Sequence, residues 1–333
     1  MMFTTRQNKI TARSTLTAVL CSFTAFAASP AISETWEMAT PYAATNFHTQ
    51  NIVQFIDDIA QNTGGEIEIN LHPGGSLIKH PEIKNAVRSG QVQIGEFALS
   101  LLSNENPIFQ VDALPFLVGS YEEAAELWKA SRPATEAALA EQNIKVLYAV
   151  PWPPQGLYAQ EEVTDLAQMA GQKFRAYNAT TTTIATLMGA VPAQIEAPDL
   201  AQAFVTGRVE SMITSPTTGV TSKAWDYVGH FHHIQGWLPK NIVVMNLDVY
   251  NGLSEETQMA IMEAAEAANA RGWAESEVQT NDALATLQEN GVQVHQPSDE
   301  LRSQVRSIGD QIVAEWRNRA GPEGEEILKK FEE

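Results

Sequence analysis

An arginine near the middle of the chain has the best-placed side chain for binding chemistry. Arg175 ends the short run 173–176, which is predicted to be a strand, and a helix is predicted to follow it. In open α/β sheets the carboxyl ends of the strands border the crevice in which ligands bind. A guanidinium offers two parallel N–H donors that match a carboxylate. The pattern favours a binding site for an organic acid, and a surface or interdomain salt bridge is the alternative for Arg175.

Three histidines form the only dense group of imidazoles: His230, His232 and His233. Two histidines two residues apart on a strand could bind Zn²⁺, which would suit a secreted metal-dependent hydrolase. No third ligand stands at a familiar spacing, although Asp226 lies four residues before His230. We favour a histidine cluster at a domain surface, or packing of the imidazoles beside Phe231, and therefore expect no metal and no cofactor.

Aromatic side chains supply a second indication of a ligand site. Loops and element ends of the second half carry Trp152, Tyr158, Tyr177, Trp225 and Trp237. Such residues can form the apolar wall of a cleft, and packing in the core is the alternative for at least half of them. The chain after position 33 has no cysteine nucleophile, G-x-S-x-G elbow, P-loop or dinucleotide-binding turn. We therefore expect a binding protein and not an enzyme.

The composition and the N-terminus indicate where the protein works. The 333 residues carry a formal net charge of −19, which argues against nucleic acid as a partner. Arg6, Lys9 and Arg13 precede an apolar run at 16–28, and Ala31-Ile32-Ser33 follows with small residues at the two positions that matter for cleavage. Residues 1–33 are therefore predicted to be a signal peptide, which contains the only cysteine, Cys21. Export without disulfides indicates a bacterial periplasmic protein.

The elements that must position these side chains form two α/β series. Residues 34–98 and 173–214 each alternate strand and helix patterns, which is typical of mostly parallel sheets covered by helices. A helix predicted at 254–290 would be about 54 Å long, too long for one domain to cover. We expect two α/β domains, 34–152 plus 243–270 and 153–242 plus 271–333, with a hinge near 151 and 242 and in the long helix.

The order of several short motifs resembles one known family. These motifs are Thr63-Gly64-Gly65-Glu66-Ile67, Ala113-Leu114-Pro115-Phe116-Leu117, Gly171-x-Lys173-x-Arg175-x-x-Asn178, Met188-Gly189-Ala190-x-Pro192 and Gly207-x-Val209-Glu210. Over essentially the whole mature chain they resemble the solute-binding proteins of tripartite ATP-independent periplasmic (TRAP) transporters, the dicarboxylate-binding-protein-like (DctP) family. The resemblance implies a two-domain periplasmic solute-binding fold with a hinge and one domain-spanning helix.

The resemblance also implies roles for individual residues. Arg175 matches the carboxylate-binding arginine of the family, and Asn178 matches its neighbour in the same loop. Gln155 stands where some members place a second arginine, and Asp199 stands where the family usually has Glu. The remaining residues that we expect around the ligand are Thr40, Tyr42, Phe97, Ala98, Trp152, Tyr177, Ser215, Trp237 and Asn241.

These expectations combine into one function. The chain is expected to be the extracytoplasmic solute-binding subunit of a TRAP transporter, which captures a small organic acid between its domains and delivers it to the membrane permease. One carboxylate clamp and aromatic walls favour a monocarboxylate with an apolar or ring-bearing body. A small hydroxy, keto or amino acid, or a sugar acid, is the alternative. A sensory periplasmic binding protein would share the same fold.

Overall fold

The computed structural model describes residues 1–5 and 34–333. The basic residues, apolar run and cleavage site of the predicted signal peptide lie at 6–33, outside the described residues, so this expectation stays a prediction. Among the helices of residues 34–333, none combines the length and the apolar composition that a membrane span needs.

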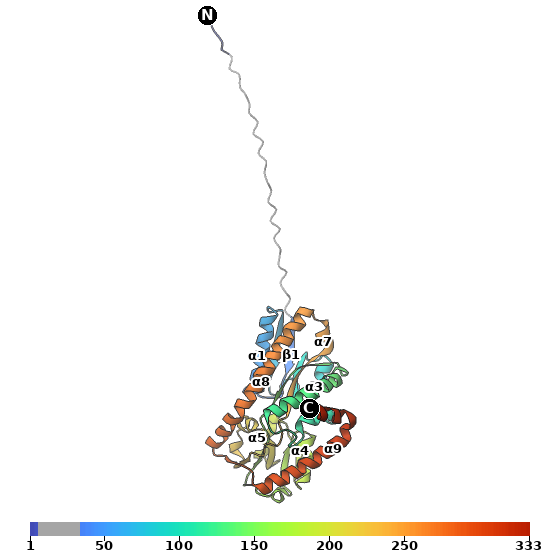
Figure 1. Cartoon of the computed structure of the whole chain (residues 1–333). Helices are drawn as coiled ribbons and strands as arrows, with labels where there is room; N and C mark the ends of the chain where they lie inside the picture. The colour runs from blue at the N-terminus through green and yellow to red at the C-terminus, as the bar shows by residue number, and fades with distance from the viewer. Residues whose placement is uncertain (6–33) are drawn as a thin grey trace. The chain divides into compact units, whose positions relative to one another are not determined.

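The first sheet contains β1, which is labelled in Figure 1, and has five strands in the order β2-β1-β3-β10-β4. Strands β2 and β3 run parallel to β1, and β10 runs antiparallel to both β3 and β4. The bounds are β1 (Glu34–Ala39), β2 (Ile67–His72), β3 (Ile94–Ala98), β4 (Ile144–Pro151) and β10 (Lys240–Asn246). All seven residues of β10 belong to this sheet, so the late strand completes a sheet built from the first part of the chain.

The second sheet has six shorter strands in the order β11-β9-β5-β8-β6-β7. Strand β6 runs parallel to β7 and β8, whereas β5 is antiparallel to β8 and β9. The bounds are β5 (Gly156–Ala159), β6 (Lys173–Ala176), β7 (Val191–Gln194), β8 (Ser211–Thr214), β9 (His230–His232) and β11 (Gln293–His295). The carboxyl ends of β6, β7 and β8 therefore share one edge, where Arg175 was expected to face a ligand.

The chain passes between the sheets three times, and the first two crossing segments are hydrogen-bonded to each other. The first joins β4 to β5 and contains Trp152 and Gln155, and the second joins β9 to β10. The amide of Trp152 donates to the carbonyl of Pro239 at 2.8 Å, and the amide of Gln155 donates to the carbonyl of Trp237 at 3.0 Å. The domain boundaries and the hinge expected near 151 and 242 stay a prediction.

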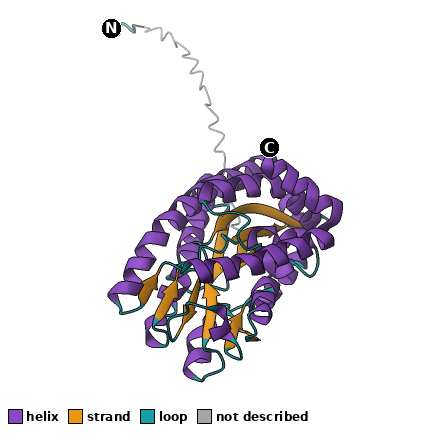
Figure 2. Cartoon of the chain, turned by 60° about the horizontal axis from the view of Figure 1, so that its bottom comes forward, coloured by secondary structure: helices purple, strands orange, loops and turns teal. Residues whose placement is uncertain are grey.

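Helices cover the strands on both sides (Figure 2). Their bounds are α1 (Phe47–Asn62), α2 (Ile83–Arg88), α3 (Tyr121–Ala140), α4 (Ala179–Leu187), α5 (Leu200–Val205), α6 (Pro216–Thr221), α7 (Leu247–Gly252), α8 (Glu255–Glu289) and α9 (Asp299–Glu332). Helix α1 illustrates how the sequence sets them. Asn46 caps its first turn by accepting from the amide of His48, and Ile52, Phe55 and Ile59 bury one face.

The long helix predicted from the sequence is confirmed. Helix α8 has 35 residues and packs against α1 and β4 beside the first sheet and against α6 and β11 beside the second. Gly272 lies in the middle of α8. A larger residue would not fit at this position, because a Cβ there would collide with Val150 and lie 2.9 Å from Nδ2 of Asn51. The absence of a side chain at 272 therefore lets α8 approach the end of β4.

The C-terminal helix α9 also touches both parts of the protein. It contacts α4 near the second sheet and α3 and the 3₁₀ helix η3 (Pro107–Ala113) near the first. The helix bends at Gly321, whose positive φ of 57° suits glycine, directly before Pro322. The indole N–H of Trp316 donates to the carbonyl of Pro107 at 2.6 Å and fixes the helix on that side.

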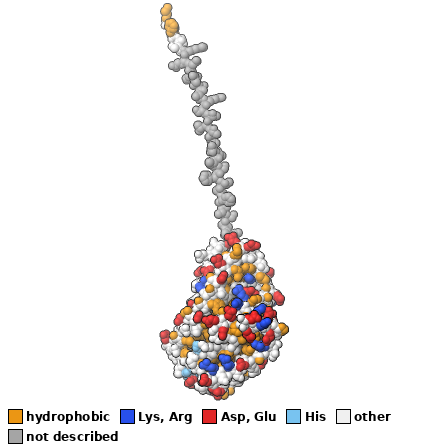
Figure 3. All heavy atoms as spheres, in the orientation of Figure 1, with side chains coloured by type: hydrophobic (Ala, Val, Ile, Leu, Met, Phe, Trp, Pro, Cys, Tyr) orange, Lys and Arg blue, Asp and Glu red, His pale blue; other side chains and the backbone are white. Residues whose placement is uncertain are grey.

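The surface agrees with the acidic composition. On the face drawn in Figure 3, acidic side chains are spread among smaller groups of basic ones. No broad basic surface of the kind that binds a phosphate backbone is visible on this face.

Candidate functional site

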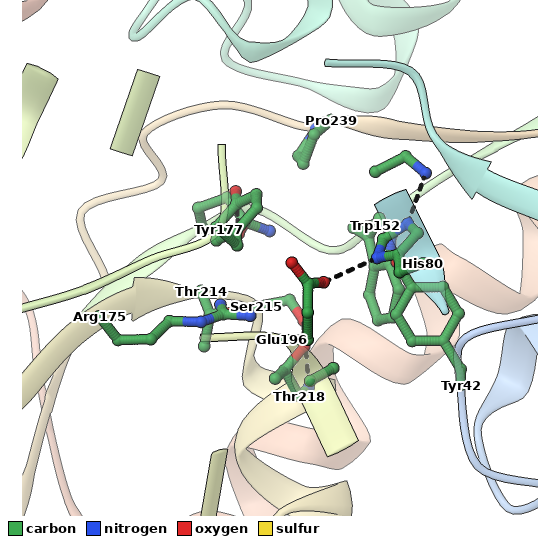
Figure 4. A pocket seen from close by; sticks show the side chains of 13 residues that line it. Tyr42, His80, Trp152, Arg175, Tyr177, Glu196, Thr214, Ser215, Thr218 and Pro239 are labelled. Carbon is green, nitrogen blue, oxygen red and sulfur yellow. Dashed lines mark hydrogen bonds and ion pairs between the residues drawn. The ribbon is translucent and has the colours of Figure 1, made fainter. Parts of the chain in front are cut away.

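A cavity opens where the ends of strands from both sheets approach each other (Figure 4). Its empty space amounts to about 470 Å³ including the open mouth. Thirteen residues line it: Tyr42, His80, Ala98, Trp152, Gln155, Arg175, Tyr177, Glu196, Ala197, Thr214, Ser215, Thr218 and Pro239. The lining therefore combines aromatic side chains with a few charged groups.

Arg175 enters the cavity from the end of β6. Only 4% of the residue is exposed, its Nε donates to the carbonyl of Ile195 at 2.9 Å, and its guanidinium carbon lies 4.6 Å from the ring centre of Tyr177. Its terminal nitrogens have no hydrogen bond and no carboxylate within 4.0 Å among the residues that the structure describes. Burial lowers the pKa of Arg175, while Tyr177 and Glu196 oppose the shift. An arginine stays protonated in proteins, so the cavity contains a buried, unpaired cation.

This geometry answers the choice left open by the sequence. A salt bridge would have consumed the guanidinium, and the described residues contain no such bridge. The two outer nitrogens of Arg175 instead remain available as a donor pair of the kind that binds a carboxylate.

Glu196 lies between Arg175 and His80, and it comes from the loop that follows β7 (Figure 4). Nδ1 of His80 is 3.0 Å from Oε2 of Glu196, and Nε2 of His80 accepts from the amide of Ala98 at 3.2 Å. Since Nε2 must supply a lone pair, the imidazole proton belongs on Nδ1, which donates to Glu196. Burial alone would raise the pKa of Glu196, but the bond from His80 and the charge of Arg175 hold it below its ordinary value.

The aromatic wall rests on a buried polar network behind it. The indole N–H of Trp152 donates to Oδ1 of Asn241 at 2.9 Å, and the Tyr42 hydroxyl donates to the same oxygen at 3.3 Å. Nδ2 of Asn241 donates to Glu96 at 2.8 Å, and Thr40 donates to the other oxygen of Glu96 at 2.5 Å. Burial raises the pKa of Glu96 to about 7 in spite of these two bonds. The network fixes the orientation of both rings.

The second-sheet wall supplies hydroxyl and amide groups. The Tyr177 hydroxyl donates to Oε1 of Gln155 at 3.1 Å, and Nε2 of Gln155 donates to the carbonyl of Pro153 at 2.9 Å. Ser215 caps α6 by accepting from the amide of Thr218 at 3.1 Å. These hydrogen bonds hold the polar side chains in one arrangement before any ligand is present.

Seven of the predicted site residues line this cavity and five do not. Those that do are Tyr42, Ala98, Trp152, Gln155, Arg175, Tyr177 and Ser215. Thr40 and Asn241 stand behind the aromatic wall in the network around Glu96. Trp237 is 1% exposed and borders a separate small apolar cavity that includes Val305 and Ile308.

The other two predicted residues, Phe97 and Asn178, border a neighbouring hollow that shares His80, Tyr177 and Glu196 with the cavity. Asn178 is the N-cap of α4, and its Nδ2 donates to the Ser100 hydroxyl at 2.9 Å.

Six lining residues were not predicted: His80, Glu196, Ala197, Thr214, Thr218 and Pro239. Glu196 follows the end of β7, the parallel neighbour of β6, so the rule that selected Arg175 applies to it as well. No comparable signal was available for His80, which reaches the cavity from η1 (His80–Glu82) of the first part of the chain.

The histidine group does not form a metal site in the described part of the chain, where no cluster of three or more metal-ligating side chains is present. His230 is bonded to His295 at 2.9 Å, and Nε2 of His232 accepts from the amide of Val163 at 3.0 Å. Burial lowers the pKa of His232 to about 4, so this imidazole is neutral. His233 is not part of the stack formed by His230, His232 and His295. The geometry gives no support to the hydrolase alternative.

Comparison with known proteins places this geometry in context. The signature of the family described as bacterial extracellular solute-binding protein, family 7 (DctP), matches residues 38–319. The ectoine/5-hydroxyectoine-binding periplasmic protein UehA of Ruegeria pomeroyi is 24% identical over 95% of both chains.

Two solved structures are each similar over 90% of this chain. A TRAP solute-binding protein from a marine metagenome, specific for pyroglutamate, is 41% identical, with a TM-score of 0.89 over 90% of this chain and 99% of that one. DctP7 of Bordetella pertussis, an extracytoplasmic solute receptor binding pyroglutamic acid, is 39% identical, with a TM-score of 0.89 over 90% of this chain and all of that one. The expected α/β fold with two sheets is thereby confirmed.

Proposed function

The chain belongs to the bacterial extracellular solute-binding proteins of family 7, and from this premise we propose that its cavity binds a small ring-bearing monocarboxylate of the pyroglutamate type. As a TRAP solute-binding receptor it takes up a small organic acid. The finer assignment draws on the pyroglutamate bound by relatives that are 37–41% identical and on the lining of the cavity.

The observation that carries the proposal is the buried, unpaired guanidinium of Arg175. A cation that is 4% exposed and lacks an acidic partner among the described residues has lost most of its hydration. A ligand carboxylate supplies two charge-assisted hydrogen bonds and so restores what burial removed. The cavity therefore favours an anion at this end.

The aromatic wall accounts for the body of the ligand. Tyr42 and Trp152 lie edge to face with ring centres 4.9 Å apart, and their polar atoms are turned into the network around Asn241. Their ring surfaces face the cavity opposite the second-sheet wall (Figure 4). A flat ring with an apolar face fits this surface, whereas an extended polyol would leave hydroxyl groups without partners there.

The hydrogen bonds across the cavity favour a protein that closes on its ligand. We propose two lobes, 34–152 plus 240–270 and 153–239 plus 271–333, which move about the crossings at 151–155 and 233–239 and within α8; residues 240–242, which were expected in the second lobe, lie in β10 of the first sheet. His80 to Glu196, Ser100 to Asn178 and Gln110 to Thr180 link residues of the first lobe with residues of the second. Closure of this kind is the motion of periplasmic binding proteins.

The proposed receptor acts outside the cytoplasm and with a membrane partner. We infer a periplasmic location, a TRAP permease that accepts the closed form, and no chemical change to the ligand. The family supports each point, and the predicted signal peptide at 1–33 is consistent with export.

A thermal unfolding screen tests the proposal directly. The mature protein is unfolded and refolded to remove any co-purified ligand and then mixed with organic acids that include L-pyroglutamate, lactate, glucuronate and ectoine. A ligand that binds only the native state raises the unfolding midpoint, because at 100 times its Kd it adds about 2.7 kcal/mol to the free energy of unfolding. We expect the largest shift for L-pyroglutamate. The proposal fails if that acid gives no shift while another class of solute does.

A further inference from the structure

The carboxylate of Glu196 shares the cavity with Arg175, and the proposed function gives it no role. Its side chain is 23% exposed, and it projects between Arg175 and the aromatic wall (Figure 4). We propose that Glu196 determines specificity: it accepts a hydrogen bond from an N–H group of the ligand and excludes ligands with a second carboxylate. This inference rests on the proposed binding of a small acid at Arg175.

The surroundings of Glu196 keep it an acceptor. The amide of Ala98 occupies Nε2 of His80, so Nδ1 carries the proton and points at Oε2 of Glu196. The carboxylate thus receives a hydrogen bond and has no need of a proton of its own. Nε2 of Gln194 approaches the other oxygen at 3.3 Å. A carboxylate has about four lone-pair positions, so acceptor capacity remains for a ligand.

Three other polar groups of the wall are already engaged. The Tyr177 hydroxyl is bonded to Gln155, the Gln155 amide to Pro153, and the Trp152 indole to Asn241. A ligand N–H that enters the cavity therefore finds its strongest acceptor at Glu196. A ligand that brings an ether oxygen or a methylene to the same place leaves the carboxylate without the bond.

The charges in the cavity lead to the same conclusion. Arg175 and Glu196 contribute one charge of each sign, and a monocarboxylate on Arg175 leaves one net negative charge. A dicarboxylate would add another beside Glu196, where burial makes like charges costly. The cavity therefore suits a ligand with a carboxylate at one end and a neutral or cationic N–H at the other. In pyroglutamate, the acid that the similar proteins bind, the ring amide has that N–H.

Matched ligands test the role of the N–H by titration calorimetry. L-Pyroglutamate is compared with 3-oxocyclopentanecarboxylate, in which CH₂ replaces the ring N–H, and with 5-oxotetrahydrofuran-2-carboxylate, in which oxygen replaces it. Glutarate serves as the dicarboxylate. A lost charge-assisted hydrogen bond predicts about 10- to 100-fold weaker binding of the two ring analogues. We expect the oxygen analogue to bind least well of the two, because its lone pairs face the carboxylate.

The variant Glu196→Gln then assigns the discrimination to this residue. An amide both donates and accepts, so the preference for N–H over ring oxygen should fall to about threefold or less, and glutarate should gain affinity. Glu126→Gln on the exposed face of α3 is the matched control and should change nothing.

The outcomes separate the two proposals. Equal binding of the three ring acids by the wild type refutes the role of Glu196 and leaves the proposed function intact. Equal weakening of all three in Glu196→Gln would limit the residue to its bond with His80 and would also refute the inference. If the wild type binds none of the ring acids, the proposed function itself is wrong.

Discussion

Replacement of Arg175 by alanine should abolish tight binding while leaving the fold intact. The substitution removes the only positive charge among the residues that line the cavity, and with it the two free nitrogens that face a ligand carboxylate. Loss of one partner from a buried charged pair costs about 2–5 kcal/mol, which corresponds to about 30- to 4,000-fold in Kd. Glu196 would remain as an unbalanced anion, so we expect a value in the upper half of this range.

The stability of the ligand-free protein should respond in a different way. The guanidinium is buried with one hydrogen bond, to Ile195, so its removal relieves a desolvated charge as well as creating a cavity. These effects oppose each other, and the unfolding midpoint without ligand should stay close to that of the wild type. Arg175→Lys keeps the charge but lacks the planar pair of donors, so its affinity for the acid should lie between those of the wild type and Arg175→Ala.

Calorimetry with L-pyroglutamate and thermal unfolding with and without it provide the two measurements. Arg132→Ala is the matched control, because Arg132 forms a half-exposed pair with Glu136 within α3 and does not line the cavity. If Arg175→Ala binds the acid within about threefold of the wild type while remaining folded, the reasoning from the unpaired guanidinium is refuted.

Three further predictions concern the wall, the long helix and pH. Trp152→Ala should weaken L-pyroglutamate more than lactate in calorimetry, because only the ring-bearing acid covers the indole; equal losses would contradict an aromatic wall. Gly272→Ala should lower the free energy of unfolding in urea by about 1–3 kcal/mol, because its Cβ meets Val150, whereas Gly252→Ala has nothing within 4 Å and should be neutral or better. Burial raises the pKa of Glu96 in the folded state to about 7, against an ordinary 4.5. The protonated carboxyl therefore stabilises the folded state at low pH, and this contribution to the free energy of unfolding is lost as pH rises through 7. Relative to Glu96→Gln, the free energy of unfolding of the wild type should fall by about 3 kcal/mol between pH 4.5 and 8, and parallel curves for the two proteins would rule this out.

Elements with strong local signals were predictable from the sequence. Helices α1 and α8 have a capping residue, a periodic buried face and a clear end, so each was found within a residue or two. Strands β5, β9 and β11 were missed, because their places depend on tertiary contacts. Gly156 of β5, for example, has no room for a side chain because the ring of Phe231 lies against it.

Residues that line the cavity were predictable where the position along a strand decides the direction of the side chain. Arg175 lines the cavity as expected, because the end of a parallel strand borders the crevice. Phe97 and Ala98 show the limit of this reasoning, since neighbours on β3 point to opposite faces and only Ala98 borders the cavity. The sequence indicates that a strand end is near a ligand. Which of two neighbouring side chains faces the cavity, and which residue lies opposite it, can be seen only in the folded structure. His80 could not be found for this reason.

The polar character of the bonds across the cavity has a consequence for how binding and closure are coupled. Each of the three pairs that join the proposed lobes can exchange its partner for water; the two neutral pairs contribute about 1 kcal/mol net each, and the bond from His80 to the carboxylate of Glu196 contributes about 1.5–3 kcal/mol. Such bonds make the closed form available without making it dominant. A ligand that binds Arg175 and Glu196 on one side and lies against Trp152 and Tyr42 on the other contacts both lobes at once. Its differential affinity for the closed form is then what shifts the equilibrium. An acid that meets Arg175 alone would bind weakly and leave the protein open, so we expect selectivity and closure to depend on the same few contacts.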